Sequence, residues 1–232
     1  MRRASSVVGA RAGQRGFTLL EIALVMVVIG VLYAAVTSGT EVLRAAKGQR
    51  LLNEFVFAWT EAFLRHVKDV GVVPGDNVSS PKHIILTPGG GRLLCNQPGN
   101  PELSNTFLGN SVSIPTGDAP GEEAARVYQD SRGSPHVLNA CMQTTDWSVP
   151  GLSVGSFQTK DRHVLVLRGL TTELAAQFDS AIDGRADARY GRFRSAALAA
   201  SLSPTGSNWP TGTADAEGWA NEVDAYLDMS GN

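Results

Sequence analysis

The feature that most constrains this chain is an apolar run from Phe17 to Val36, which contains a single charged residue, Glu21. About 20 residues at about 1.5 Å of helical rise each span the hydrocarbon core of a bilayer. The residues before the run are basic and include no acid: Arg2, Arg3, Arg11 and Arg15. This asymmetry predicts a cytoplasmic N-terminus and a body on the other side of the membrane. A carboxylate within such a run is costly without a partner, so Glu21 is a candidate functional residue.

Two ordinary interpretations of the run are open on physical grounds. The first is a secretory signal peptide, for which Ala34 and Ala35 could form the cleavage region. The second is a plain membrane anchor in which Glu21 lies at the level of the lipid headgroups. The signal-peptide interpretation assigns no role to Gly16 or to Glu21.

The segment Gly16-Phe17-Thr18-Leu19-Leu20-Glu21, with the apolar residues after it, resembles the prepilin cleavage and methylation segment. That segment is found in type IV pilins and type II secretion pseudopilins. The resemblance implies cleavage between Gly16 and Phe17 by a prepilin peptidase, followed by N-methylation of Phe17. It also implies that the helix is retained, first as a membrane anchor and later in the core of a filament with other pilins or pseudopilins.

Cleavage at this site would place a new amine on Phe17, four residues before the Glu21 carboxylate. In a bundle of parallel helices stepped along an axis, Glu21 of one subunit can face the Phe17 amine of the next. Breaking an ion pair in a medium of low dielectric constant destabilises by several kcal/mol. Glu21 is therefore predicted to set the register in which subunits assemble.

We divide the chain into a leader, residues 1–16, a long helix, residues 17–70, and a globular head, residues 71–232. Residues 17–36 are the predicted membrane-spanning half of the helix. Its second half is amphipathic, because apolar residues recur at steps of three and four. These residues are Leu52, Phe55, Trp59, Phe63, Val67 and Val70. The helix is expected to end at Gly71, before a Pro-Gly-Asp turn.

The expected fold class is α+β, with the long helix packed on a small antiparallel β-sheet that carries loop-rich insertions. Residues 163–167 predict a central strand because they are apolar at consecutive positions. Thr171 or Thr172 is expected to cap a helix over 173–182. Further predicted elements are a hairpin of 83–87 with 91–95, a weak strand at 112–114, a short helix within 121–128, a strand at 136–142, an edge strand at 191–194 and an acidic amphipathic helix over 215–228.

The two cysteines, Cys95 and Cys141, are predicted to form one disulfide bond in an oxidising compartment. Closing a loop of about 47 residues would stabilise the fold by about 4 kcal/mol in the chain-entropy model. The alternative is a pair of free, buried thiols. Both cysteines lie after the apolar run and therefore on the exported side.

Three aspartates, Asp179, Asp183 and Asp187, suggest two interpretations. Calcium prefers several oxygen ligands in a compact loop. These acids are four residues apart, however, and Arg185 and Arg189 lie among them. The competing interpretation is the C-terminal end of a helix with surface salt bridges, and we assign no metal site.

Charge and motifs limit the remaining function classes. Removal of residues 1–16 leaves 16 basic and 22 acidic residues, a net charge of −6. Binding of nucleic acid is not expected, because it requires a basic face. The chain lacks phosphate-binding, zinc-protease and nucleophile-elbow motifs, so neither a cofactor nor enzymatic activity is expected. A membrane-anchored periplasmic enzyme is the alternative from another class.

The sequence thus predicts a structural subunit of a type IV pilus or related filament, in particular a minor pilin. A type II secretion pseudopilin is the alternative within the same class. The expected partners are the prepilin peptidase, other pilins or pseudopilins and an inner-membrane assembly platform. The protein would cross the inner membrane once, with its head in the periplasm, and become extracellular after assembly.

Overall fold

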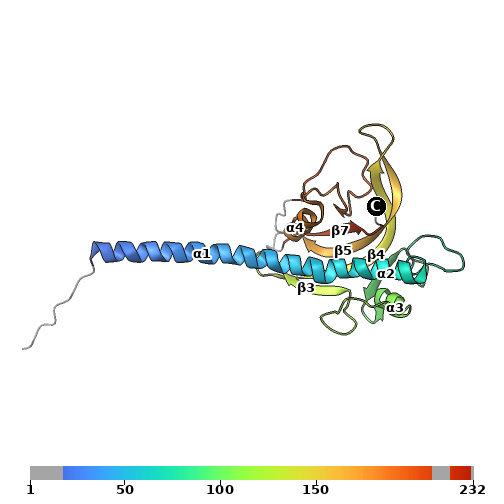
Figure 1. Ribbon diagram of the computed structural model, residues 1–232, viewed down its shortest axis with the longest axis horizontal. Coiled ribbons are helices and arrows are strands. Elements are labelled where there is room, and N and C mark those ends of the chain that lie inside the picture. Colours follow the sequence, from blue (N-terminus) through green and yellow to red (C-terminus); the bar gives the residue numbers. More distant parts are fainter. Residues whose placement is uncertain (1–17, 211–219, 231–232) are drawn as a thin grey trace, which may run out of the picture. The chain divides into compact units, whose positions relative to one another are not determined.

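A computed structural model describes residues 18–210 and 220–230 of the chain. The chain divides into two compact units, residues 1–43 and 44–232, and each is described by itself. The first unit contains most of helix α1 (Leu19–Leu51). The second begins within α1 and includes the whole sheet (Figure 1).

The long helix is confirmed and runs without interruption from Leu19 to Val70. A π-helical segment, η1 (Leu52–Phe57), follows α1 and leads directly into α2 (Ala58–Val70). Two consecutive residues of η1, Phe55 and Val56, are both fully buried. Gly71 ends α2 as expected, with the left-handed backbone that glycine adopts at low cost (φ 85°).

Seven strands among the described residues form one antiparallel sheet, with the order β2-β1-β4-β5-β7-β6 and with β3 paired to β4. The strands are β1 (Leu93–Gln97), β2 (Asn100–Pro101), β3 (Ala125–Gln129), β4 (Pro135–Pro150), β5 (Phe157–Thr171), β6 (Phe193–Ser195) and β7 (Glu222–Asp228). The two other helices are α3 (Glu102–Leu108) and α4 (Thr172–Asp183). β4 and β5 form a long, curved hairpin (Figure 1).

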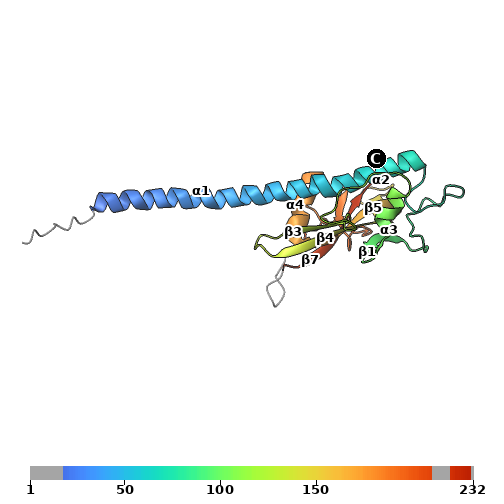
Figure 2. The same cartoon turned by 90° about the horizontal axis from the view of Figure 1, so that it is seen from below.

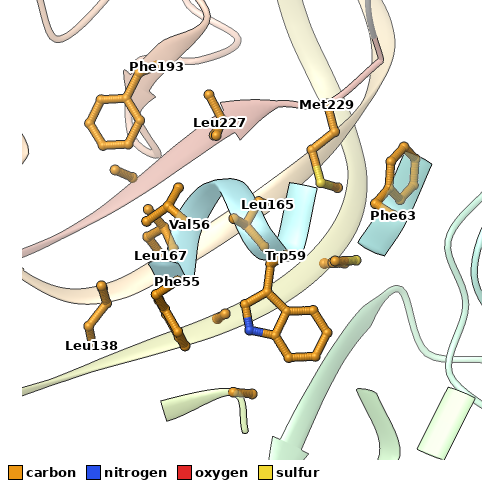
Figure 3. Packing of buried hydrophobic residues seen from close by; sticks show 14 of the residues in the cluster. Phe55, Val56, Trp59, Phe63, Leu138, Leu165, Leu167, Phe193, Leu227 and Met229 are labelled. Carbon is orange, nitrogen blue, oxygen red and sulfur yellow. The ribbon is translucent and has the colours of Figure 1, made fainter. Parts of the chain in front are cut away.

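One face of the sheet packs against the helices and forms the main core. Trp59 and Phe63 of α2, with Phe55 of η1, meet Leu165 of β5 and Leu227 of β7 in this core (Figure 3). α4 adds Leu174, Ala175 and Phe178 to the same cluster. The alternation of buried and exposed side chains along the strands therefore determines which side of the sheet the helices cover. Figure 2 shows the helices and the sheet of this unit from below.

The second face of the sheet carries a smaller apolar cluster. Its buried members are Cys141, Trp147, Val164, Val166 and Ala199. Ala199 comes from the irregular segment after β6, so residues 184–210 cover part of this face. The part that is formed by β3 and the first residues of β4 remains open, with Val127 and Val137 exposed.

The predicted central strand and the helix after it are confirmed. β5 contains residues 163–167 and lies between β4 and β7. Thr171 caps α4 by accepting a hydrogen bond from the Leu174 N–H, and Gly184 ends the helix. The predicted strand at 136–142 lies within β4, and the predicted edge strand at 191–194 overlaps β6.

The predicted hairpin of 83–87 with 91–95 is wrong. The turn exists, because the Thr87 N–H bonds to the Gly91 carbonyl at 2.7 Å, but residues 83–87 form no strand. The Asp76 carboxylate holds this segment by accepting the N–H groups of Lys82 and His83. β1 pairs with β2 and β4 instead.

Three weaker predictions in the loop-rich region and the tail also differ from the structure. Residues 112–114 form no strand, since Val112 closes the end of α3 by bonding to the Phe107 carbonyl. The expected short helix within 121–128 is largely β3, which pairs with β4. The expected helix over 215–228 is β7 from Glu222 on, because Ala225 and Leu227 are buried at a period of two. Residues 215–219 of that prediction lie outside the described part of the chain.

Candidate functional site

The start of α1 contains Glu21, which was predicted to guide assembly. Gly16 and Phe17 lie outside the described residues. Thr18 and Glu21 form a reciprocal capping box, in which the Glu21 carboxylate accepts the Thr18 N–H at 2.9 Å. The Thr18 Oγ1 in turn accepts the Glu21 N–H at 3.2 Å. This arrangement satisfies two backbone donors that a helix N-terminus otherwise leaves free.

The helix after the capping box exposes apolar side chains on all its sides. The consecutive residues Val25, Met26, Val27, Val28 and Ile29 are each at least half exposed. Five consecutive helical positions cover the full circumference, so this part of α1 has no single apolar stripe. Within residues 18–210 and 220–230, no helix meets the length and hydropathy criteria for a membrane span.

A family model described as the prokaryotic N-terminal methylation motif matches residues 11–37. The chain carries a prepilin-type N-terminus. This motif is typical of type IV pilins and type II pseudopilins, and it implies a membrane-anchored N-terminal segment that a prepilin peptidase processes. Pilin-like proteins of this kind are generally structural rather than enzymatic. No curated protein and no solved structure matches the chain.

The head of this prepilin-type protein contains the predicted disulfide bond between Cys95 and Cys141. The two residues are direct partners in the register of β1 and β4, and their Cα atoms lie 4.4 Å apart. This separation matches a cross-strand pair that does not share backbone hydrogen bonds, in which side chains approach most closely. Neither cysteine is a free thiol in this structure.

The three aspartates of the calcium hypothesis hold the backbone of residues 184–210. Asp183 accepts the N–H groups of Arg192 and Phe193, and Asp187 accepts those of Arg189, Tyr190 and Ser207. Among the described residues, no group of three or more His, Cys, Asp or Glu side chains could hold a metal ion. One expected ion pair is present, since Arg185 binds Asp187 at 2.6 Å.

Asp179 differs from the expected surface position, because its side chain is fully buried. Its Oδ2 accepts the Trp209 indole N–H at 2.7 Å and the Asp187 N–H at 2.6 Å, while its Oδ1 has no partner. Burial raises the pKa of Asp179 to about 6; the two hydrogen bonds oppose this rise and the charge of Asp183 adds to it. Asp187 has a lowered pKa, since its N–H donors outweigh the effect of burial.

His136 lies in the described cluster that most resembles acid–base machinery. It is buried, and its two ring nitrogens face carboxylates, with Nδ1 2.8 Å from Glu222 and Nε2 3.4 Å from Asp130. The Tyr128 ring stacks on it, and the Tyr128 hydroxyl bonds to the Gly169 carbonyl. Because both nitrogens are occupied by carboxylates, His136 has no position at which to activate a nucleophile. The cluster joins the β3–β4 hairpin to the start of β7.

The sequence interpretation missed the tip of the β4–β5 hairpin, residues 150–157, which we call the finger. Leu152 and Val154 are fully exposed there. The available signal was an apolar residue on either side of Ser153 within a Gly- and Ser-rich turn. Turn composition alone does not distinguish a buried loop from one that presents aliphatic side chains to solvent.

Proposed function

We propose that this protein is a structural subunit of a type IV pilus or related filament, and in particular a minor pilin. The observation that carries the proposal is the prepilin-type segment, which continues into a helix with apolar side chains on every side. Such a helix must be covered by lipid or by other apolar helices. A filament core of parallel helices provides the second environment.

In this proposal, assembly moves the apolar helix from the lipid of the membrane into a filament core of parallel apolar helices. Prepilin peptidase cleaves between Gly16 and Phe17, Phe17 is N-methylated, and the helix anchors the head on the periplasmic side of the inner membrane. An inner-membrane assembly platform then moves the subunit into the filament, where Glu21 faces the Phe17 amine of a neighbour. The choice of a minor rather than a major subunit rests on the size of the head, residues 71–232.

The test is mass spectrometry of the mature protein together with fractionation of cells. We expect an N-terminus at a methylated Phe17 and recovery of the protein in filaments that are sheared from the cell surface. An N-terminus at Met1, or one after Ala35, would overturn the proposal. Recovery only in a secretion pseudopilus would select the type II pseudopilin within the same class.

A further inference from the structure

A pocket of about 800 Å³ lies beside the last turns of α1, within the second unit. Its walls come from residues 44–55 of α1 and η1, from residues 126–133 of β3 and the turn after it, and from the first turns of α4 (Figure 1). Sites for small ligands usually measure about 300–1,000 Å³. The pocket is therefore large enough to enclose such a ligand.

Most charged side chains that line this pocket have a partner within the head. A charge whose partner is in place gains less from a ligand of opposite sign, because the ligand must compete with the existing contact. Arg132 also interacts with another residue of the chain. The other pairs are Arg50 with Glu54, Arg126 with Asp118, and Asp130 with His136.

Three charged side chains of the pocket lack such a partner. Arg44 and Lys47 lie three residues apart and therefore on one face of α1, and Glu173 lies in the first turn of α4. All three residues are exposed, and in the part of the chain that the structure describes none of them forms an ion pair. The pocket thus has two cations on its α1 wall and one carboxylate on its α4 wall.

One hydrogen bond holds these two walls together. The amide of Gln177, one turn after Glu173 in α4, donates to the Ala45 carbonyl of α1 at 2.9 Å. Ala45 lies between Arg44 and Lys47 in the chain, so the opposite charges are in place before a ligand arrives. A simple anion would face Glu173, and a simple cation would face the two basic side chains. The complementary ligand carries both an anionic and a cationic group.

Only a short stretch of sequence separates the pocket from the apolar run. Arg44 follows Val36 by eight residues in the same helix. Eight residues measure about 12 Å as a helix, and the interfacial layer of a bilayer is about 5–8 Å thick on each side of the hydrocarbon core. Long basic side chains near the end of a membrane helix reach back toward this layer. Lipid headgroups are therefore within reach of Arg44.

We propose that this pocket binds the headgroup of phosphatidylethanolamine from the membrane in which the chain is anchored. Arg44 and Lys47 bind the phosphate, and Glu173 accepts hydrogen bonds from the primary ammonium. Both contacts are charge-assisted hydrogen bonds, which are stronger than those between neutral groups. The bound lipid holds the head beside the bilayer until the helix leaves the membrane. The inference needs only the membrane-anchored segment and does not depend on the role in a filament.

The first test is native mass spectrometry of the full-length chain in detergent with three added lipids. Phosphatidylethanolamine, phosphatidylcholine and phosphatidylglycerol carry identical acyl chains, so binding to the apolar helix contributes equally. We expect phosphatidylethanolamine to be retained about tenfold more than the other two, roughly the factor that one hydrogen bond to a charged group contributes. The choline group has no N–H to donate to Glu173, and the glycerol group has no positive charge. Equal retention of the three lipids, or a preference for phosphatidylglycerol, overturns the inference.

A soluble compound with the same headgroup distinguishes a lipid ligand from a small metabolite. Glycerophosphoethanolamine lacks the acyl chains that keep the lipid beside the apolar helix. At a concentration equal to that of phosphatidylethanolamine, we expect it to leave the lipid bound. Displacement of the lipid at equal concentration would assign the pocket to the soluble compound and overturn the lipid as its ligand.

Substitutions test which residues bind each part of the headgroup. Glu173→Lys should reverse the preference, from phosphatidylethanolamine to phosphatidylglycerol, because the pocket then contains three cations and no unpaired acid. Arg44→Gln combined with Lys47→Gln should lower retention of phosphatidylethanolamine to that of phosphatidylcholine. Lys68→Gln and Asp69→Asn are the matched controls and should change nothing, because both residues are exposed on α2 and do not line the pocket. An unchanged preference in Glu173→Lys, or an equal loss in the controls, overturns the inference.

Fractionation of cells separates this inference from the proposed function. A chain that enters sheared filaments but shows no preference for phosphatidylethanolamine overturns the lipid site alone. A chain that prefers this lipid but never enters filaments supports the lipid site and overturns the filament role.

Discussion

The single acid of the apolar run already has a partner within its own chain. Thr18 and Glu21 satisfy each other at the start of α1, so the Glu21 carboxylate caps its own helix. Pairing with a neighbour's Phe17 amine would add a charge–charge interaction to this hydrogen-bonded arrangement. In the proposed filament, Glu21 would therefore have two separable roles, as a helix cap and as a charge.

Substitutions at Glu21 separate these two roles. Glu21→Ala removes both the cap and the charge, whereas Glu21→Gln keeps an oxygen that can accept the Thr18 N–H. We expect both variants to be processed, stable and membrane-bound, because loss of a charge eases insertion. Both should be incorporated into sheared filaments at a level at least tenfold below wild type, measured by immunoblot against the membrane fraction. Wild-type incorporation of Glu21→Gln would show that the cap alone is sufficient.

Ionisation of the buried Asp179 carboxylate lowers the stability of the head. Its pKa is raised to about 6 from an ordinary value of 3.8, so the folded state binds more protons than the unfolded state between these values. The free energy of unfolding therefore falls as the pH rises from about 4 to about 6. At about pH 7 the buried carboxylate is largely charged and the loss is nearly complete.

The substitution Asp179→Asn should remove the fall in the free energy of unfolding that ionisation of Asp179 causes. The asparagine oxygen can accept the bonds from Trp209 and Asp187, and the side chain carries no charge to bury. We expect the variant to be more stable than wild type by about 1–3 kcal/mol at pH 7 and little different at pH 4. The measurement is urea unfolding of the detergent-solubilised protein at both pH values. An equal change in the free energy of unfolding at pH 4 and at pH 7 would contradict the raised pKa of Asp179.

At the scale of elements, one contact ties α4 to the last turns of α1. Gln177 of α4 donates to the Ala45 carbonyl at 2.9 Å and lies against Gly48. A Cβ added at Gly48 would lie 2.5 Å from the amide of Gln177. Because this amide is the flexible end of a side chain, it can move away, but it would then lose the bond to Ala45.

This geometry predicts coupling between the two residues. Gly48→Ala should gain about 1 kcal/mol of helix propensity and lose about 1 kcal/mol with the displaced hydrogen bond, for a net effect near zero. In a Gln177→Ala background the same substitution should stabilise by about 1 kcal/mol. A double-mutant cycle from thermal unfolding measures the difference. Additive effects would mean that Gln177 does not occupy the space beside Gly48.

At the scale of the whole molecule, the disulfide bond links two parts of the chain separated by 46 positions. It joins β1 to β4, and β1 pairs with β4 only along residues 93–95. The strand therefore depends on the covalent bond more than its neighbours do. Loss of the bond should lower the stability of the head.

Replacement of both Cys95 and Cys141 by alanine should destabilise the head by about 2–5 kcal/mol. Thermal unfolding of the purified full chain measures this loss, with the reduced wild-type protein as a control that should shift by a similar amount. Thiol labelling of the unfolded, unreduced wild-type protein should find no free thiol. Two labelled cysteines would contradict the bond.

Local patterns in the sequence determined the long helix, its stop at Gly71, the central strand β5, the capped helix α4 and the pairing of the two cysteines. The helices and the strand depend on a hydrophobic period, a helix cap or a helix breaker that acts over a few residues. The pairing of the cysteines depends on the redox state of the compartment. The prepilin-type segment is recognisable for the same reason, because its residues are contiguous.

Tertiary structure alone decided the remaining features. Glu222–Asp228 has a pattern that also fits a helix, and it is a strand because the edge of β5 is available to pair with it. Asp179 is buried because Trp209, 30 residues away, covers it. The open part of the second sheet face depends on how far residues 184–210 cover that face and on where β1 and β3 share the edge of β4. Such contacts join residues that are distant in the chain, and no local period encodes them.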